Sequence, residues 1–208
     1  MAENYQLCLN QILAEIDADA LPTLLLHACC APCSSYILEY LNRYFQITLF
    51  FYNPNIFPKA EYLHRKEELE RLIREMPLEH SVKIIDGDYC PEQFFTLAKG
   101  LEHLLECEER CQKCIRHRLE KTFQLAKTLE HTPDFVGTTL SISPHKDAAF
   151  INEAGAALSE KYNVPWLFSD FKKKGGYQRS IVLSREYRLY RQAFCGCVYS
   201  KENQKNQK

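Results

Sequence analysis

The sequence predicts an α/β fold in which a parallel sheet carries helices on both faces. Short apolar runs alternate along the chain with longer segments of helical periodicity, and this alternation is typical of parallel sheets. The runs at 23–27 and 46–52 lack the polar alternation of a half-exposed strand, so we expect both faces of each to be buried. Ligands of such sheets bind beyond the carboxyl ends of the strands. The chemistry should therefore lie in loops that follow strands.

The elements before the middle of the chain follow from periodicity and from turn residues. An amphipathic helix is expected over 5–16, ahead of the first strand. After that strand, Pro32 and the serines at 34 and 35 suit a helix start, and helical spacing runs over 36–41. A charged amphipathic helix over 59–75 is ended by Pro77.

The second half continues the alternation. A third strand is expected at 82–85, closed by an Asp-Gly-Asp turn, and helical segments are expected over 91–105 and 115–129. Further strands at 135–139 and 164–168 enclose a helix over 147–162. We expect one domain over 1–200 and a disordered tail over 201–208, where Lys, Glu, Asn and Gln replace the apolar pattern.

Ten cysteines are the main anomaly of the composition. No apolar run approaches the roughly 20 residues of a membrane helix, and the N-terminus lacks the order of a secretory signal, so we expect a cytoplasmic protein with no membrane partner. In a reducing compartment, clustered cysteines indicate metal binding or redox chemistry rather than structural disulfides. Seven of them form three groups: Cys29, Cys30 and the nearby Cys33; Cys111 and Cys114; Cys195 and Cys197.

Each group has a spacing that suits a shared centre. A Cys-x-x-C at the start of a helix places two thiolates beside backbone N–H groups that stabilise negative charge. Cys29 and Cys30 can face one centre if the chain turns sharply, and Gly196 allows either a shared centre or a strained disulfide at the Cys-Gly-Cys. Four thiolates suit Zn²⁺ or an iron–sulfur cluster, and spacing does not separate the two. The surplus of cysteines favours redox work, because a structural zinc site needs only four.

Each of the other notable residues has a purely structural interpretation, and some also have a functional one. Cys8, Cys90 and Cys107 are expected to be plain buried residues, whereas Cys33 either faces the core or is a spare ligand. His27 is expected to be a hydrogen-bonded core histidine. One polar loop either binds phosphate at a helix N-terminus or forms a simple capped turn: Ser141, Ser143, His145 and Lys146.

The charge distribution indicates a surface that faces a polyanion. The formal net charge is −1, but seven basic residues and one acidic residue between 171 and 191 give that segment +6 and leave −7 on the rest. We interpret its first part as a mobile basic loop that contacts RNA phosphates and stacks a base on its tyrosine, with a merely solvated lysine run as the alternative. The residues concerned are Lys172, Lys173, Lys174, Tyr177 and Arg179.

Five short strings of the chain are distinctive when taken together: HACCAPCS at 27–34, ERCQKC at 109–114, TTLSISPHK at 138–146, DFKK at 170–173 and YRQAFCGC at 190–197. In this order, over about residues 22–200, they resemble the QueH family of epoxyqueuosine reductases. The resemblance implies a fold similar to the adenine-nucleotide alpha-hydrolase (HUP-like) superfamily. It also implies cobalamin-independent reduction of epoxyqueuosine to queuosine at the tRNA wobble position, and electrons from a donor protein of unknown identity.

The resemblance also implies roles for six cysteines. Cys29, Cys30, Cys111 and Cys114 would ligate a [4Fe-4S] cluster. Cys195 and Cys197 would form a redox-active disulfide pair, or hold a second iron or other metal beside the cluster. Glu108, Asp147 and His145 are conceivable proton donors that the sequence does not separate.

Three rival functions follow from the same residues. A zinc-stapled RNA-binding protein would have no reaction of its own. A tRNA-thiolating or nucleotide-activating enzyme would share the α/β fold, but the chain has neither a G-x-G-x-x-G nor a Walker loop, and cysteines replace a glycine-rich loop after the first strand. A thioredoxin-like oxidoreductase would need only one Cys-x-x-C.

Overall fold

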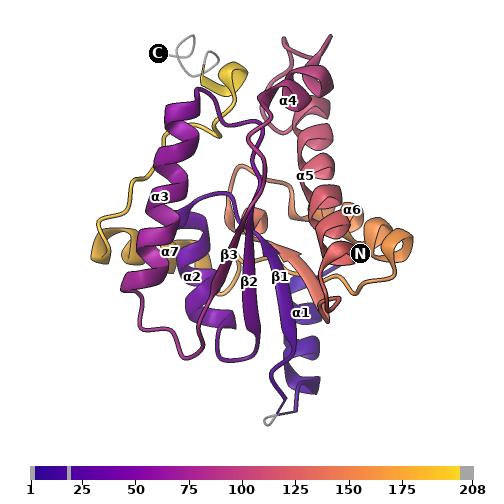
Figure 1. Ribbon diagram of the computed structural model, residues 1–208, viewed down its shortest axis with the longest axis vertical. Helices are drawn as coiled ribbons and strands as arrows, with labels where there is room; N and C mark the ends of the chain where they lie inside the picture. Colours follow the sequence, from indigo (N-terminus) through magenta and orange to yellow (C-terminus); the bar gives the residue numbers. More distant parts are fainter. Residues whose placement is uncertain (1–2, 18–19, 202–208) are drawn as a thin grey trace.

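The fold is a four-stranded parallel sheet surrounded by helices, which confirms the predicted α/β class. A computed structural model describes residues 3–17 and 20–201, and its strands follow the order β3-β2-β1-β4 (Figure 1). The strands are β1 (Thr23–His27), β2 (Gln46–Phe51), β3 (Lys83–Asp86) and β4 (Phe135–Thr138). The helices are α1 (Tyr5–Glu15), α2 (Ala31–Leu41), α3 (Lys59–Glu75), α4 (Pro91–Ala98), α5 (Glu109–Thr128), α6 (Ala148–Tyr162) and α7 (Gly176–Glu186), with a 3-10 turn η1 (Thr139–Ile142).

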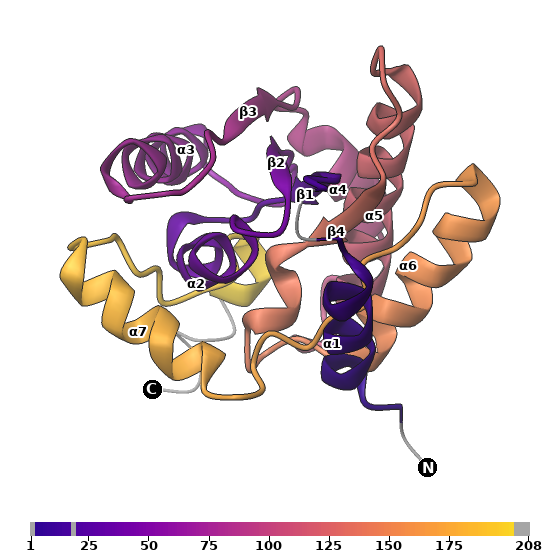
Figure 2. The same ribbon diagram turned by 90° about the horizontal axis from the view of Figure 1, so that it is seen from below.

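The leucine run of β1 is buried on both faces because helices cover both sides of the sheet. Leu24 and Leu26 belong to one apolar cluster, whereas Leu25 between them belongs to another. The first cluster contains side chains of α1, α2 and α3, and the second contains side chains of α5 and α6. Figure 2 shows these two layers on opposite sides of the strands.

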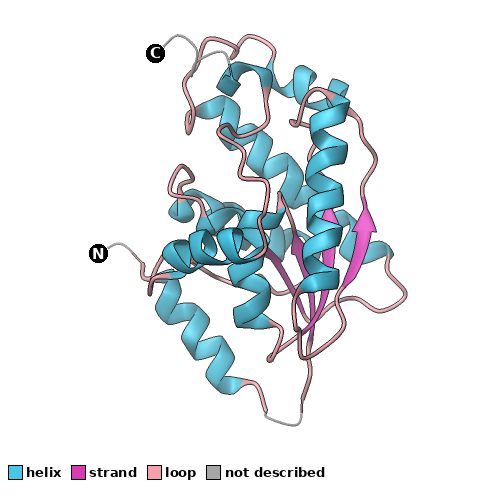
Figure 3. Ribbon diagram, turned by 90° about the vertical axis from the view of Figure 1, so that its left-hand side faces the viewer, coloured by secondary structure: helices cyan, strands magenta, loops and turns pink. Residues whose placement is uncertain are grey.

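The strand order places a topological switch between β1 and β4. The chain passes from β1 to β2 and β3 on one side, then crosses to β4 on the other side of β1. The carboxyl ends of two such diverging strands leave a crevice where α/β proteins bind ligands. The cysteines that follow β1 and the 3-10 turn that follows β4 both lie at this crevice. Figure 3 shows further helices and loops gathered beyond the same ends of the strands.

Two helix boundaries differ from the prediction. The helix expected over 91–105 ends at Ala98, because Gly100 takes a left-handed backbone (φ 81°) and turns the chain. The helix expected from Ile115 begins at Glu109, so Cys111 and Cys114 lie within its first two turns. The prediction that the Cys-x-x-C opens this helix is confirmed.

The expected fifth strand over 164–168 is wrong. Only an isolated parallel bridge between Trp166 and Val136 forms there, with hydrogen bonds from Val136 N to the Pro165 carbonyl and from Leu167 N to the Val136 carbonyl, both 2.8 Å. Pro165 has no N–H to donate, so the pairing cannot extend as a regular ladder.

The basic loop that we expected over 172–179 is a turn only as far as Gly175. Tyr177 and Arg179 instead lie in α7, which packs against α2. The two glycines that suggested a loop instead permit the close packing: Gly175 takes a left-handed backbone (φ 76°), and a Cβ on Gly176 would lie 2.4 Å from a ring carbon of Tyr36.

No helix among the described residues is long and apolar enough to cross a membrane. The predicted tail over 201–208 lies outside the described residues except for Lys201, which is in a helical turn.

Candidate metal centre and active site

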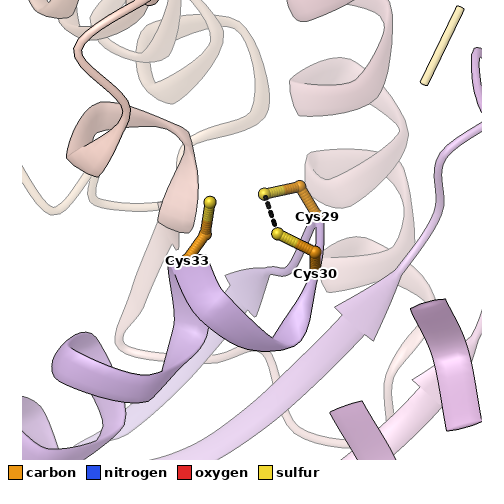
Figure 4. Close-up of side chains that lie close together, drawn as sticks. All are labelled: Cys29, Cys30 and Cys33. Atoms are coloured by element: carbon orange, nitrogen blue, oxygen red, sulfur yellow. Dashed lines mark hydrogen bonds between the residues drawn. The ribbon is translucent and has the colours of Figure 1, made fainter. Parts of the chain in front are cut away.

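Three cysteines converge where β1 passes into α2. The Sγ atoms of Cys29, Cys30 and Cys33 all lie within 4.8 Å of one another, and Figure 4 shows the three side chains facing one space. Cys30 is the N-cap of α2 in an extended conformation, and this turn lets two neighbouring cysteines point the same way. Cys33, whose role the sequence left open between core and ligand, belongs to this group.

The environment of this triad favours one thiolate in the absence of metal. Hydrogen bonds from the thiols of Cys29 and Cys33 lower the pKa of Cys30, and Gln192 adds an amide N–H donated to its Sγ at 3.0 Å. The hydrogen bond between the Cys29 thiol and Cys30 raises the pKa of Cys29 to about 11. Thr139, which follows β4, accepts the backbone N–H of Cys29 at 3.3 Å and its hydroxyl lies 3.5 Å from the Cys29 Sγ.

A second group of four cysteines lines a small buried cavity. Cys111 and Cys114 come from α5, and Cys195 and Cys197 come from the segment after α7. Burial raises the pKa of Cys114, and it raises that of Cys197 to about 12 together with the charge of Cys195. All ten cysteines of the chain are free thiols, so no disulfide joins Cys195 to Cys197 here.

The Cys-Gly-Cys segment is fixed by contacts from distant elements. Arg65 of α3 donates to the carbonyl of Cys195 at 3.1 Å, and the Gly196 carbonyl accepts the N–H of Phe57 at 3.0 Å. Gly196 has φ 119°, and a Cβ there would lie 2.9 Å from Cγ1 of Ile56. The glycine is therefore required both by its backbone conformation and by its close approach to the loop after β2.

A cavity of about 220 Å³ opens beside both cysteine groups. Cys29, Cys33 and Cys195 are among the residues that line it, and Tyr177 and Phe194 contribute aromatic rings. Its charged lining residues are mostly basic: Arg65, Arg118, Lys146 and Arg191, against Glu106. The cavity is thus suited to a polar ligand that approaches the sulfur atoms.

Arg118 and Lys146 line both the large and the small cavity. Burial lowers the pKa of Arg118, but the negative charge that the neighbouring cysteines carry when deprotonated, Cys114 and Cys195 first among them, outweighs burial and raises it. The same balance holds for Lys146. Burial lowers its pKa, but the charges of Cys195 and of the Glu106 carboxylate, 2.9 Å from its Nζ, outweigh burial and raise the pKa above its ordinary value. Both cations therefore stay charged beside the cysteines.

The remaining sequence predictions have mixed outcomes. His27 is a fully buried core histidine, as expected: it donates to the Tyr52 carbonyl at 3.1 Å and accepts from the Thr138 hydroxyl at 3.0 Å, and burial lowers its pKa to about 4. The expectation of plain burial for the three isolated cysteines is wrong, because Cys8 and Cys90 are half-buried and Cys107 is exposed. All three lie outside both cavities.

The polar loop after β4 forms a capped turn, as one of the two interpretations had it. Asp147 is the N-cap of α6 and accepts the N–H groups of Ala149 and Phe150. Ser141 Oγ pairs with Ser169 at 3.3 Å, and Ser143 accepts from the His145 N–H. Of the three conceivable proton donors, only His145 lines the large cavity; Glu108 Oε2 instead accepts the N–H of Leu105.

The five candidate RNA-binding residues are placed differently from one another. The Lys172 ammonium contacts the carbonyls of Ser141 and Lys146 and the carboxylate of Asp170, so it braces the fold. Arg179 pairs with Glu39 and Glu186. Lys173 and Lys174 are exposed, and Lys174 contacts the Asn10 side chain at 3.2 Å. Tyr177 lines the large cavity.

Comparison with known proteins identifies the family of this site. The family model described as epoxyqueuosine reductase QueH matches residues 24–203. The chain belongs to the QueH family. The matched residues include every cysteine that lines the two cavities, and the members of the family are named as reductases.

Curated QueH relatives cover most of the chain. Epoxyqueuosine reductase QueH of Staphylococcus epidermidis is 43% identical over 202 residues, which are 95% of this chain and 84% of the relative. Those of Streptococcus pyogenes and Thermotoga maritima are 39% and 37% identical, covering 97% and 86% of this chain and 79% and 90% of the relatives. A solved structure of TcCGT1 with UDP is similar only at TM-score 0.40 and 12% identity, over 71% of this chain and 28% of that one.

Several site residues were not singled out from the sequence. Arg65, Arg118, Glu106, Thr139 and Gln192 belong to the site only through contacts between distant segments. A signal for Arg118 was nevertheless present, since Arg110, Cys114 and Arg118 recur at intervals of four along α5 and so share a face of that helix.

Proposed function

We propose that this chain reduces epoxyqueuosine to queuosine at the wobble position of tRNA without cobalamin, using a [4Fe-4S] cluster held by Cys29, Cys30, Cys111 and Cys114. The observation that carries the proposal is the shared lining of the two cavities. Cys29 lines one and Cys111 and Cys114 line the other, and Arg118 and Cys195 line both. The two thiol groups therefore face a common region at the switch point of the sheet.

The residues present fit such a cofactor. The sulfurs are the ligands that iron–sulfur clusters use, and buried polar atoms around them lack partners: Asn55 Oδ1, Arg110 Nε and Nη2, and Gln192 Oε1. Unpartnered buried polar atoms are rare in native folds and are explained by a missing group or water. These three residues line one or the other cavity, so the missing partner belongs to the site.

The reaction constrains what the side chains do. Removing the epoxide oxygen as water consumes two electrons and two protons, and a bound iron–sulfur cluster supplies electrons one at a time. Cys195 and Cys197 would either hold a second metal, which would supply Lewis-acid chemistry, or provide the two electrons and two protons as the dithiol closes to a disulfide. A Cys195→Ser variant tests both roles. Full activity with full iron content in that variant would contradict both.

The large cavity accommodates only part of a nucleotide. Its volume of about 220 Å³ lies below the roughly 300–1,000 Å³ of pockets that enclose a drug-sized ligand. We infer that the modified ring enters while the anticodon backbone stays outside, near the basic residues Lys173, Lys174 and Arg191, which are exposed. Cytoplasmic tRNA and an electron-donor protein are the partners this chemistry needs.

Anaerobic purification with iron, sulfide and zinc analysis tests the proposal, followed by an assay on tRNA that carries epoxyqueuosine. We expect a brown protein with about four iron and four sulfide per chain, or somewhat more iron, that forms queuosine. A colourless protein with stoichiometric zinc that cannot be reconstituted would contradict the proposal and favour an RNA-binding zinc protein.

A further inference from the structure

Two buried arginines flank the Cys-x-x-C on one face of α5. Arg110 is 1% exposed and Arg118 is 2% exposed, and both line the small cavity with Cys111, Cys114 and Cys195. Arg118 also lines the large cavity. Both guanidinium groups remain charged in proteins, so the fold places two positive charges against the cysteines.

Neither arginine has a carboxylate partner among the described residues. Arg118 donates to the Cys114 carbonyl at 3.4 Å and to Asn53 Oδ1 at 3.3 Å, which are neutral acceptors. Arg110 donates through Nη1 to carbonyls of the 101–104 turn, its Cζ lies 5.1 Å from the Tyr199 ring centroid, and its Nε and Nη2 are unpartnered. A buried charge without a counter-charge is strongly destabilising.

Arg65 shows how the same fold compensates a buried arginine elsewhere. It is equally buried, at 2% exposed, but its guanidinium forms an ion pair of 2.7 Å with Glu61 one turn away on α3. The absence of any such carboxylate at Arg110 and Arg118 means that their counter-charge has to come from the site itself.

The cysteines are the anion that fits. Four of them line the same small cavity, and metal binding requires them as thiolates. A phosphate of the tRNA is a poorer match, because Arg110 is 1% exposed in a cavity much smaller than the one beside it.

We propose that Arg110 and Arg118 are positioning residues that serve as buried counter-ions of the thiolate-bound metallocofactor. This inference rests on the proposed function for the identity of the cofactor. Positive charge beside a metal centre favours its reduced, more negative state, so the two arginines raise its reduction potential as well as retaining it.

The test compares iron-free and iron-loaded protein for Arg110→Gln, Arg118→Gln and Arg118→Lys, with Arg65→Gln as the matched buried control. In urea unfolding of the iron-free protein, we expect the two glutamine variants at 110 and 118 to be as stable as the parent or more stable, because an uncompensated charge is gone. Arg65→Gln should be clearly destabilised, because it removes the ion pair with Glu61 together with the hydrogen bonds to the carbonyls of Phe194 and Cys195.

In the iron-loaded protein, the same two glutamine substitutions should be unfavourable. We expect Arg110→Gln and Arg118→Gln to lose iron to a chelator about tenfold faster and to show a lower midpoint potential in anaerobic titration. Arg118→Lys should restore most of both properties. Unchanged iron loss and potential, or iron-free variants destabilised like Arg65→Gln, would overturn the proposal.

Co²⁺ binding separates this inference from the proposed function. If the parent protein cannot be loaded with iron, the reductase proposal fails, while the thiolate absorption of Co²⁺ still reports on the cysteines. A Co²⁺ affinity about tenfold lower in Arg118→Gln would support the counter-ion role. An equal affinity would overturn it.

Discussion

The two groups of cysteines differ in how they are assembled. Cys29, Cys30 and Cys33 come from one turn between β1 and α2, and their sulfurs already lie within 4.8 Å of one another. The other group joins the start of α5 to the segment at 195–197, which Arg65 of α3 and the loop after β2 hold in place. A locally encoded half and a tertiary half therefore line neighbouring cavities, which share Arg118, Lys146 and Cys195.

The largest expected effect comes from breaking either half. If one cofactor bridges the groups, Cys29→Ser and Cys114→Ser should each abolish the visible absorbance and lower activity at least about 100-fold, because a lost ligand costs far more than a lost neighbour. Iron analysis and single-turnover assays measure this. Cys90→Ser is the control, since that half-buried thiol lies outside both cavities. Full iron in one of the two variants would mean that the halves hold separate sites.

The tertiary half should be the more sensitive to its backbone. Gly196→Ala forces a side chain into a left-handed conformation and within 2.9 Å of Ile56, so we expect a loss of about 2–3 kcal/mol in urea unfolding and a lower iron content. Gly100→Ala is the matched control. Its φ is 81°, but nothing lies within 4 Å of the added Cβ, so only about 1 kcal/mol should be lost. Equal losses would show that the contact with Ile56 is not what fixes the Cys-Gly-Cys.

His27 ends β1, directly before the first cysteine group, and its protonation should lower the free energy of unfolding at low pH. The pKa is about 4 in the folded protein because the ring is buried, against about 6.5 unfolded. The stability that depends on neutral His27 is present above pH 6.5 and is lost as the pH falls towards 4. Between pH 7.5 and pH 5 this amounts to about 2 kcal/mol.

Urea unfolding of iron-free protein at the two pH values measures the effect. In His27→Gln this part of the pH dependence should disappear, although the variant starts from a lower stability because the ring's hydrogen bonds are altered. A slope that persists unchanged in the variant would assign the pH dependence to other groups.

The smallest effect concerns the lysines that precede α7. Lys173→Ala should leave stability unchanged. It should reduce the slope of tRNA affinity against salt concentration by about the amount that one phosphate contact contributes. Lys172→Ala should instead cost stability, because its ammonium holds three groups of the fold. Binding titrations at several salt concentrations, with urea unfolding in parallel, separate the two. The reverse pattern would exchange the roles of these neighbours.

Much of the fold follows from local pattern. The apolar run of β1 and the amphipathic spacing of α3 and α6 encode their own elements, and Asp147 caps α6 where the sequence places a helix start. The two elements that the sequence predicted wrongly, the fifth strand and the basic loop, also have physical explanations. Pro165 cannot continue a ladder, and the Gly175-Gly176 pair that resembles a loop signal in fact permits a helix to pack closely on α2.

For the site, the sequence by itself determined that Cys29 and Cys30 follow a strand and so lie at the carboxyl edge of a parallel sheet, that the Cys-x-x-C opens a helix, and to which family the chain belongs. Only the tertiary structure decided that Cys33 joins Cys29 and Cys30, that Arg118 is shared by both cavities, and that Lys172 and Arg179 are bound within the fold. The reason is range. Periodicity and capping act over a few residues, whereas burial and charge compensation depend on side chains that meet only when distant segments pack together.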